Sequence, residues 1–364
     1  MQAIKKPKIG IIGTGLIAVS HAQGAMNCGR DCEITALCDI VPGKVARFAE
    51  ALKISGAALF ENYKELIDSG LCDMVSICTS NDMHKPIFLY AAQKGLAILC
   101  EKPIGLNGAE VEEMAAAAEK HGIVNLSGFT YRRIPAVLEM KKLIDNGTLG
   151  EIRHFRGRMY ADRMAAVDHP LEWRHLEEKA GSGVLGDLAS HALDMGMFLL
   201  GEQCGHIRKV FGEMSIRVPE RKDPATGRMV KVTCDDVCNI IGKFDSGCDV
   251  VVETSRHFPF DFEVLISGEK GLVRFSLTDY DNLGLMLYDS PADYFKQQRT
   301  VPVKTPGTAL APEPKDRMAR QYRYIVGCLT QGEAAHPTIR ETTEIAHLMD
   351  VIKASAQSEQ VMKV

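Results

Sequence analysis

The stretch "KIGIIGTGLIA", residues 8–18, decides how the first half of this chain folds. It opens with an apolar run typical of a buried strand, and two glycines follow before a helical pattern begins. Glycines at these positions allow a tight turn and let a pyrophosphate approach the amides at the helix N-terminus. The stretch therefore predicts a dinucleotide site at Gly13, Gly15, Leu16 and Ile17. A Gly-rich turn without a ligand is the alternative.

The second predicted strand, "EITALCD" over residues 33–39, ends in Asp39. A carboxylate at this place can accept hydrogen bonds from both ribose hydroxyls of the cofactor. It would repel a 2′-phosphate, and Ile40 and Val41 follow it where an arginine would favour NADP. The sequence therefore predicts NAD as the cofactor.

Short apolar runs alternate with helical patterns from residue 8 to about residue 150, which predicts βαβ units and a parallel sheet with helices on both faces. Strand-like segments then dominate and predict a mostly antiparallel sheet with one or two helices against it. The polar stretch 218–231 is expected to be a loop or hairpin tip, and the Pro-rich stretch 303–317 a surface connection. Helices are expected over 44–53, 85–94, 107–121, 316–331 and 338–357, and the later strands over 206–218, 231–244, 248–256, 261–267 and 271–277.

Composition narrows the class of protein. The 364 residues include 43 Lys and Arg against 47 Asp and Glu, a net charge of -4, which gives no reason to expect nucleic-acid or membrane binding. No signal-peptide pattern and no apolar stretch long enough to span a bilayer is found. The eleven cysteines lie mostly in apolar runs, without metal-ligand spacing. We therefore expect a cytoplasmic protein without a metal.

Two further strand ends carry polar residues. "CTSNDMHKP", residues 78–86, suggests that Thr79, Ser80, Asn81 and His84 contact the cofactor, because ligands bind at the carboxyl ends of parallel strands. For His84 the alternative is a purely structural role, in which the ring anchors the following helix.

"GLAILCEKPIG", residues 95–105, places Lys102 at the end of the next strand, where Pro103 restricts it to an extended conformation. Either this lysine stands in solvent or it points into the same crevice as the glycine turn, and the spacing leaves both open. "GSGVLGDLASHALDMGMFLLG", residues 181–201, puts Asp187 and His191 on one face of an apolar helix. Such groups need partners, and they form either a catalytic pair or a buried structural pair.

Taken together, these motifs resemble the Gfo/Idh/MocA oxidoreductases over nearly the whole chain. The resemblance rests on G-x-G-x-x-A with His21 downstream, "TSNDMH", Glu101-Lys102-Pro103, Trp173-Arg174 and G-S-G-x-x-x-D-x-x-x-H. Ser80 stands where the family usually has proline. The family implies an NAD-binding Rossmann domain, here 1–130, and an α/β domain with a large open sheet for substrate binding and oligomerisation, here 131–364. The closing helices can pack back on the first domain.

The resemblance also implies residue roles. Lys102, Asp187 and His191 match the catalytic triad at the nicotinamide and substrate. His191 is the expected base that removes a hydroxyl proton, with Lys102 as the alternative. The cofactor set also includes Glu101, Lys102, Trp173 and Arg174. The substrate set joins Lys102, Asp187 and His191 to Tyr131, Tyr160, Arg163 and His175, which lie near domain-boundary turns and offer aromatic faces or donors suited to sugar hydroxyls. For each of these last four residues, the alternative is a surface position in a connecting loop.

The expected reaction is hydride transfer between NAD and a secondary hydroxyl or ketone of a sugar, inositol or glycoside, with C3 of a glycoside among the first positions to test. Two alternatives stay open at this point. One is a redox-assisted glycosidase or lyase that oxidises a ring hydroxyl transiently. The other is a catalytically silent dinucleotide-binding sensor.

Overall fold

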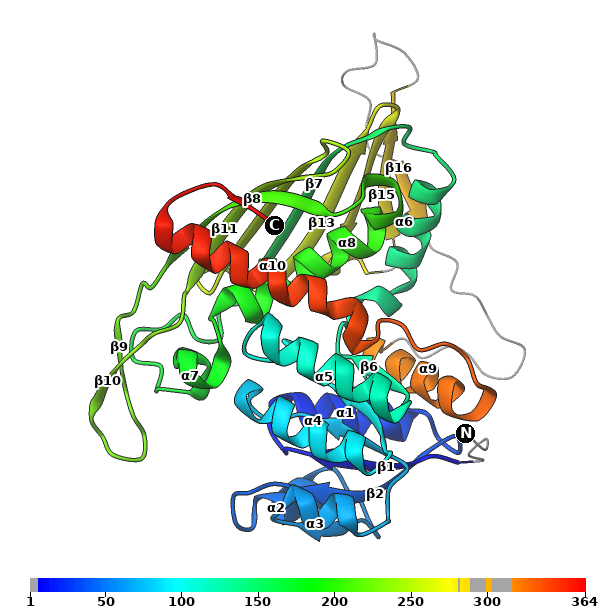
Figure 1. Ribbon diagram of the computed structural model, residues 1–364, viewed down its shortest axis with the longest axis vertical. Coiled ribbons are helices and arrows are strands. Elements are labelled where there is room, and N and C mark those ends of the chain that lie inside the picture. Colours follow the sequence, from blue (N-terminus) through cyan, green and yellow to red (C-terminus); the bar gives the residue numbers. More distant parts are fainter. Residues whose placement is uncertain (1–5, 281, 289–298, 303–315) are drawn as a thin grey trace. The chain divides into compact units, whose positions relative to one another are not determined.

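The computed structural model describes residues 6–280, 282–288, 299–302 and 316–364, and the chain divides into two compact units (Figure 1). The first comprises Met1–Thr130 and Gly307–Ala346, and the second Tyr131–Pro306 and His347–Val364. The expected second domain, 131–364, is thus interrupted by a segment that belongs to the first unit. The Pro-rich connection expected over 303–317 falls almost wholly outside the described residues.

The first unit is built on a six-stranded parallel sheet in the order β3-β2-β1-β4-β5-β6, which confirms the doubly wound fold. Because β1 pairs with both β2 and β4, the strand order reverses at β1, where open α/β sheets bind ligands. The strands are β1 (Lys8–Ile12), β2 (Glu33–Cys38), β3 (Ala58–Phe60), β4 (Met74–Ile77), β5 (Ala97–Cys100) and β6 (Asn125–Ser127).

Helices cover both faces of this sheet, and each face has its own apolar core. Ile9 and Ile11 of β1 pack with α1 (Leu16–Asn27), α2 (Lys44–Ala51) and α9 (Arg317–Gln331). Ile12 faces the opposite core. That core is completed by α3 (Tyr63–Asp68), α4 (His84–Gln93), α5 (Gly108–His121) and the start of α10 (Ile339–Ser358).

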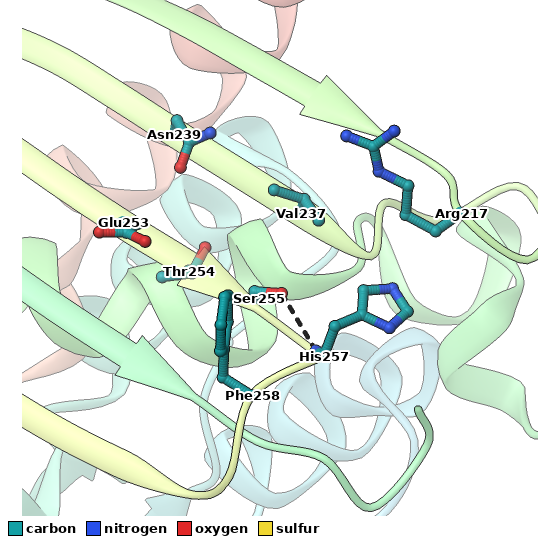
Figure 2. Close-up of a pocket in the computed structure, with 8 residues that line it drawn as sticks. All are labelled: Arg217, Val237, Asn239, Glu253, Thr254, Ser255, His257 and Phe258. Atoms are coloured by element: carbon teal, nitrogen blue, oxygen red, sulfur yellow. Dashed lines mark hydrogen bonds between the residues drawn. The ribbon is translucent and has the colours of Figure 1, made fainter. Parts of the chain in front are cut away.

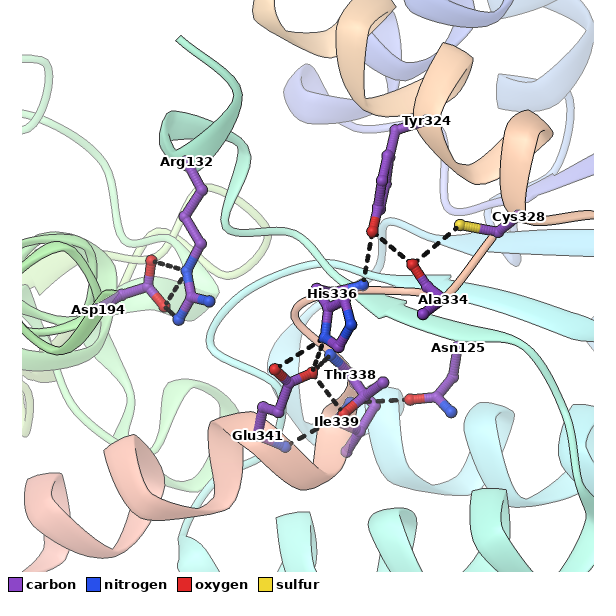
Figure 3. A network of polar contacts seen from close by, with 10 residues as sticks. All are labelled: Asn125, Arg132, Asp194, Tyr324, Cys328, Ala334, His336, Thr338, Ile339 and Glu341. Carbon is purple, nitrogen blue, oxygen red and sulfur yellow. Dashed lines mark hydrogen bonds and ion pairs between the residues drawn. The ribbon is translucent and has the colours of Figure 1, made fainter. Parts of the chain in front are cut away.

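The C-terminal segment returns to the first unit because α9 packs closely on α1. A side chain at Gly24 of α1 would place its Cβ 2.7 Å from Met318 Cγ, so only glycine permits this approach. The connection from α9 to α10 is fixed by polar contacts, in which Tyr324 Oη donates to Ala334 O at 2.6 Å and the Ile339 amide donates to Asn125 Oδ1 at 2.8 Å (Figure 3).

In the second unit, the described residues form a nine-stranded sheet in the order β16-β15-β14-β13-β7-β12-β11-β8-β17. Its pairs are antiparallel except for β7 with β12. This confirms the mostly antiparallel sheet that the sequence predicted. The strands are β7 (Ile152–Tyr160), β8 (Ile207–Ser215), β11 (Val237–Phe244), β12 (Asp249–Ser255), β13 (Asp261–Gly268), β14 (Gly271–Ser276), β15 (Asn282–Leu287), β16 (Arg299–Pro302) and β17 (Met362–Lys363). The stretch 218–231 forms a separate hairpin of β9 (Glu220–Lys222) and β10 (Met229–Lys231).

One face of this large sheet is covered by helices. A Cβ at Gly157 of β7 would lie 2.9 Å from Ala192 of α8 (Ser190–Cys204), and a Cβ at Gly196 of the same helix would lie 3.1 Å from the Phe155 ring. The C-terminal part of α10 lies on β8, where the Gly212 amide donates to Ser355 Oγ at 3.0 Å. The shorter helices are η2 (Thr130–Arg133), α6 (Pro135–Asp145), η3 (Trp173–His175), α7 (Glu177–Ala180) and η4 (Leu185–Ala189).

The other face of the sheet carries alternate side chains that no described helix covers, among them Ile241, which is 62 % exposed. Within the described residues, no helix is both long and apolar enough to cross a membrane.

Candidate active site

The predicted dinucleotide turn has the backbone geometry that a pyrophosphate requires. Gly13 adopts a φ of +90°, and a Cβ there would lie 2.7 Å from the carbonyl oxygen of Cys78. Gly15 begins α1 without any side-chain cap, and a Cβ on it would meet nothing within 4 Å. Leu16, the first helical residue, is 70 % exposed. The first amides of α1 therefore face open space, and this arrangement fits an anionic cofactor group.

Asp39 is fixed at the end of β2 by residues that the sequence did not single out. Its Oδ2 accepts from the Thr14 amide at 2.8 Å, from Thr14 Oγ1 at 2.7 Å and from Lys44 Nζ at 2.7 Å. Burial raises the pKa of Asp39, but the hydrogen bonds from Lys44, Thr14 and Val41 outweigh it and hold the pKa below its usual value. The carboxylate is thus ionised and oriented beside the glycine turn.

At the end of β4, Thr79 and Ser80 are half-buried, whereas Asn81 is buried. His84 is 1 % exposed, and its ring nitrogens lie 3.0 Å from Pro103 O and 3.3 Å from Thr79 O. Burial lowers its pKa, so the ring is neutral at ordinary pH. His84 therefore ties the loops after β4 and β5 together. This geometry favours the structural role over direct contact with a cofactor.

A buried polar network, which the sequence did not predict, lies directly behind Lys102. Glu101 Oε1 is 2.8 Å from His21 Nε2, and His21 Nδ1 is 3.0 Å from the Tyr322 hydroxyl, which lies 2.6 Å from Ser76 Oγ. Burial alone would raise the pKa of Glu101. The hydrogen bond from His21 and the charges of His21 and Lys102 outweigh this effect, so the pKa lies below its usual value.

The second carboxylate oxygen, Glu101 Oε2, accepts from the Lys102 amide at 3.1 Å. Glu101 thus orients the turn that carries Lys102 and does not itself lie open to a ligand.

In the second unit, Asp187 lies in a π-helical turn and His191 in the α-helix that continues it. The sequence predicted a regular α-helix for both. The start of η4 is held by Asp235, whose carboxylate accepts from the Gly183 amide at 2.5 Å and the Leu185 amide at 2.9 Å. Ser190 Oγ donates to Gly186 O at 2.6 Å. Such π turns are rare and recur at functional sites.

His191 is 7 % exposed, and its ring is held edge-on by Tyr131 with a centroid separation of 4.7 Å. Tyr131 in turn packs on Phe262 at 4.8 Å and is itself 3 % exposed. Tyr131 was expected to bind substrate. Its burial instead favours a role in orienting the His191 imidazole.

The loop between β7 and α7 carries three charged residues that form a chain of contacts ending at Asp187. Arg163 donates from both terminal nitrogens to Glu172, at 2.6 and 2.9 Å, and the Arg174 guanidinium lies over the Trp173 ring at 4.2 Å. Arg174 Nε is also 3.7 Å from Asp187 Oδ2. The hydrogen bond from Arg163 is the main cause that lowers the pKa of Glu172 to about 2, so this residue is an anion.

Two residues expected at the substrate lie elsewhere. His175 is wholly buried, with Nδ1 accepting from the Glu172 amide at 2.9 Å. Tyr160 points to the uncovered face of the sheet, opposite α8, and donates to Glu253 Oε1 at 2.6 Å. Strand alternation decides this, because Phe155, Gly157 and Met159 face the helices and Tyr160 is the next residue.

A pocket of about 490 Å³ lies on the same uncovered face of the sheet (Figure 2). It is apart from Asp187 and His191, which belong to the elements on the covered face. Its lining residues are Arg217, Val237, Asn239, Glu253, Thr254, Ser255, His257 and Phe258.

The structure thus groups the candidate residues within each unit. The first unit holds the glycine turn, Asp39, the 79–84 loop and Lys102, and the second holds Asp187, His191, Arg163, Trp173 and Arg174. Among the described residues, no three or more His, Cys, Asp or Glu side chains are arranged to hold a metal ion.

Comparison with known proteins bears directly on this arrangement. Residues 7–129 match the family model "Oxidoreductase family, NAD-binding Rossmann fold", and residues 137–274 match "GFO/IDH/MocA C-terminal domain". Levoglucosan dehydrogenase of Pseudarthrobacter phenanthrenivorans is 31 % identical over 340 residues, 85 % of each chain. Myo-inositol 2-dehydrogenase of Thermotoga maritima is 26 % identical over 268 residues, 73 % of this chain and 74 % of that protein.

A solved structure of levoglucosan dehydrogenase in complex with NADH and L-sorbose matches with a TM-score of 0.89 at 27 % identity, covering 99 % of both chains. The two family models lie on the two structural units, and the glycine turn with Asp39 has the geometry of a dinucleotide site. The chain therefore belongs to the GFO/IDH/MocA family of NAD-binding oxidoreductases.

Proposed function

We propose that the protein is an NAD-dependent dehydrogenase that transfers a hydride between nicotinamide and a secondary hydroxyl or ketone of a sugar, inositol or glycoside. The observation that carries the proposal is the placement of Asp187 in the π turn η4 and of His191 in the helix α8 that continues it. The imidazole is nearly buried and held by Tyr131, and the carboxylate in the preceding turn lies 3.7 Å from Arg174. The relatives named for levoglucosan and myo-inositol support a carbohydrate as substrate.

The residues present in the first unit fit the cofactor. The amides after Gly13 and Gly15 would hold the pyrophosphate, and Asp39 would accept from the ribose hydroxyls. Strand β4 pairs with β1 at the point where the strand order reverses. The site would be completed by the residues that follow this strand, Thr79, Ser80 and Asn81. NAD supplies the hydride acceptor, and the protein supplies binding, orientation and proton transfer.

The proton chemistry falls to the proposed catalytic residues. His191 accepts the hydroxyl proton of the substrate, because an imidazole titrates near the working pH. Asp187 orients the imidazole or accepts a hydrogen bond from the sugar. Lys102 donates to the oxygen on which negative charge develops. Trp173 and Arg174 contact the sugar or the nicotinamide end from the same unit as His191.

The charges around Asp187 favour an uncharged substrate. Arg163 is bound in a bidentate pair by Glu172. Arg174 lies 3.9 Å from Glu172 and 3.7 Å from Asp187, so its charge is also balanced. Binding a phosphorylated sugar would need a surplus of positive charge that these pairs do not provide. We therefore propose a neutral polyhydroxylated ring.

The test is to follow reduced nicotinamide by its near-ultraviolet absorbance while levoglucosan, myo-inositol, methyl glycosides and a sugar phosphate are added singly. We expect NADH to accumulate with at least one neutral substrate, in preference to the phosphate. Release of aglycone without accumulation of NADH would instead identify a redox-assisted glycosidase. Binding of NAD with no turnover of any substrate would favour a dinucleotide sensor.

We also propose a homo-oligomer formed through the uncovered face of the nine-stranded sheet. Ile241 lies there directly between Phe211 and Val251 on neighbouring strands, which makes an apolar row that a second copy would bury. Ion pairs such as Arg158 with Asp261 flank the row. Analytical ultracentrifugation of I241D checks this: a smaller assembly than the wild type is expected, and an unchanged mass would contradict it.

A cytoplasmic location is proposed on the state of the cysteines. All eleven are buried free thiols, as a reducing compartment maintains them. Fractionation of the source cells with an antibody to the protein would test this location directly.

A further inference from the structure

The loop over residues 161–172 brings Arg163 and the Trp173–Arg174 turn to Asp187, yet few backbone hydrogen bonds hold it. The Ala161 amide donates to Ser255 O at 3.1 Å and the Leu171 amide to Lys222 O at 2.9 Å, and two short turns account for the Ala165 and His169 amides. Carbonyl groups in such a loop need donors from elsewhere, because buried polar groups without partners are costly.

One buried side chain supplies those donors. Arg221, on strand β9 of the hairpin, is 1 % exposed. Its Nη1 donates to Ala166 O at 2.9 Å and to His169 O at 3.0 Å, and its Nη2 donates to Met164 O at 2.8 Å. A single guanidinium therefore gathers three carbonyl groups of the loop around one point.

The clamped loop is connected by short contacts to the proposed catalytic residues. His169 Nε2 lies 2.9 Å from Glu172 Oε1, and Glu172 holds Arg163 in a bidentate pair. Glu172 is also within 3.9 Å of Arg174, whose Nε lies 3.7 Å from Asp187 Oδ2. A shift of the loop would therefore move the groups that face Asp187.

A second buried arginine, Arg256, contacts the turn formed by Trp173 and Arg174. It is 1 % exposed, its Nη2 donates to Arg174 O at 3.4 Å, and its Nη1 lies 3.6 Å from Asp236 Oδ1. Asp236 Oδ2 accepts from the Arg217 amide at 2.8 Å, just before the hairpin that carries Arg221 begins. Arg221 thus binds the middle of the loop, and Arg256 binds the turn that follows it.

We propose that Arg221 is a positioning residue for substrate recognition, which fixes the 161–172 loop so that Arg163, Trp173 and Arg174 are presented to the sugar. The hairpin β9–β10 becomes part of the substrate-binding machinery although it does not touch the substrate. The recognition step rests on the function proposed above, whereas the clamping of the loop does not.

The guanidinium is specifically required. Its nitrogens lie in a rigid planar fork and reach carbonyl groups on two sides, whereas a lysine has one nitrogen at the end of a flexible chain. R221K keeps the charge and nearly the volume but cannot hold Met164 O and His169 O together. Arg228, exposed at the tip of the same hairpin, provides the matched control variant R228K.

Trp173 is the only tryptophan of the chain, so its fluorescence reports the position of this turn without any substrate. In R221K we expect a red-shifted emission and acrylamide quenching about twofold stronger than in the wild type, with an unchanged far-ultraviolet circular dichroism spectrum. R228K is expected to match the wild type in both. Wild-type emission and quenching in R221K would overturn the clamp whether or not the protein turns over a sugar.

Kinetics then test the recognition step. With the substrate identified above, R221K is expected to raise KM for the sugar about tenfold, to leave kcat within threefold and to leave the dissociation constant of NADH unchanged. If Trp173 in R221K is quenched more strongly but KM for the sugar is unchanged, the positioning role is overturned. A loss of kcat and NADH binding together would likewise show general damage and overturn it.

A measurement on the wild-type enzyme covers the case in which R221K does not fold. Limited trypsin digestion is expected to cleave after Arg163, inside the 161–172 loop, at least tenfold more slowly than after Arg228, at the exposed tip of the hairpin. Equal rates in the two segments would overturn the clamp.

Discussion

Arg132 and Asp194 form a bidentate ion pair that is almost withdrawn from solvent. Arg132 Nε and Nη2 donate to the carboxylate at 2.6–3.1 Å, and the two side chains are 12 % and 2 % exposed (Figure 3). The guanidinium also lies over the Phe198 ring at 5.0 Å. Since Asp194 and His191 lie on the same helix, α8, the pair anchors the residues next to Tyr131 onto the helix that carries the proposed base.

We expect D194A to lower the free energy of unfolding by about 3–5 kcal/mol, because it leaves a buried guanidinium without its carboxylate. The double variant R132M/D194A should lose distinctly less than the sum of the two single variants R132M and D194A. Urea denaturation followed by circular dichroism provides the four values of the cycle. Additive losses would contradict a coupled pair.

Glu101 and His21 make a second buried pair, with side chains 7 % and 0 % exposed. E101Q removes the charge that this imidazole faces, so we expect a loss of about 3 kcal/mol in the free energy of unfolding. Y322F removes only one hydroxyl from the same network and should cost about 1 kcal/mol. Thermal and urea denaturation measure both losses. Equal losses in the two variants would show that the charge of Glu101 contributes no more to stability than the Tyr322 hydroxyl does.

Asp39 is expected to determine the choice of cofactor. D39G removes the acceptor for the ribose hydroxyls, so KM for NAD should rise by about tenfold to a hundredfold, the worth of charge-assisted hydrogen bonds. The preference for NAD over NADP should shrink by a similar factor. Initial rates with both cofactors measure this, and K44M serves as the control that keeps the carboxylate. A wild-type enzyme with a lower KM for NADP than for NAD would refute the assignment.

His191 is the proposed base, so H191A should lower kcat by about a hundredfold or more while the dissociation constant of NADH stays unchanged. K102A is the comparison. If H191A retained most of the turnover and K102A lost it, the base would be Lys102.

His175 makes stability depend on pH. Burial first, and then the charges of Arg256 and Arg221, lower its pKa to about 4. An unfolded histidine titrates near 6.5, so between these values the unfolded chain binds a proton that the folded chain does not. The free energy of unfolding should therefore fall as the pH falls from 6.5 towards 4, by up to about 1.4 kcal/mol per pH unit.

Urea midpoints at pH 7, 6 and 5 measure this dependence. H175N keeps a hydrogen-bond acceptor for the Glu172 amide but has no titrating ring, and it should show a flatter profile. Identical slopes in H175N and the wild type would place the dependence on other groups.

Much of the first unit could be predicted from the sequence because its signals are local. The glycine turn, the apolar runs and the polar residues at their ends are neighbours along the chain. Asp39, Thr79 and Lys102 then lie at one edge of the sheet, because each follows the carboxyl end of a parallel strand. The short β3 was missed, since three residues carry too little pattern to be recognised.

The second unit shows what spacing cannot decide. Tyr160 and His175 stand beside plausible substrate residues in the sequence, but one faces the uncovered side of the sheet and the other is buried. A strand reverses the side of each successive residue, so the face of Tyr160 depends on the register of the sheet. The π turn at Asp187 likewise depends on Asp235, which lies far along the chain.

By itself, the sequence determined the doubly wound unit and its glycine turn, because periodicity and motif spacing express local backbone preferences. The resemblance of its motifs to a family marked Lys102, Asp187 and His191 as candidates. Only the tertiary structure decided which side chains support them. The pairs Glu101 with His21, Arg132 with Asp194, and Arg221 with its loop join residues distant in sequence. Such contacts arise from packing, where burial forces each polar group to find a partner wherever the fold brings one.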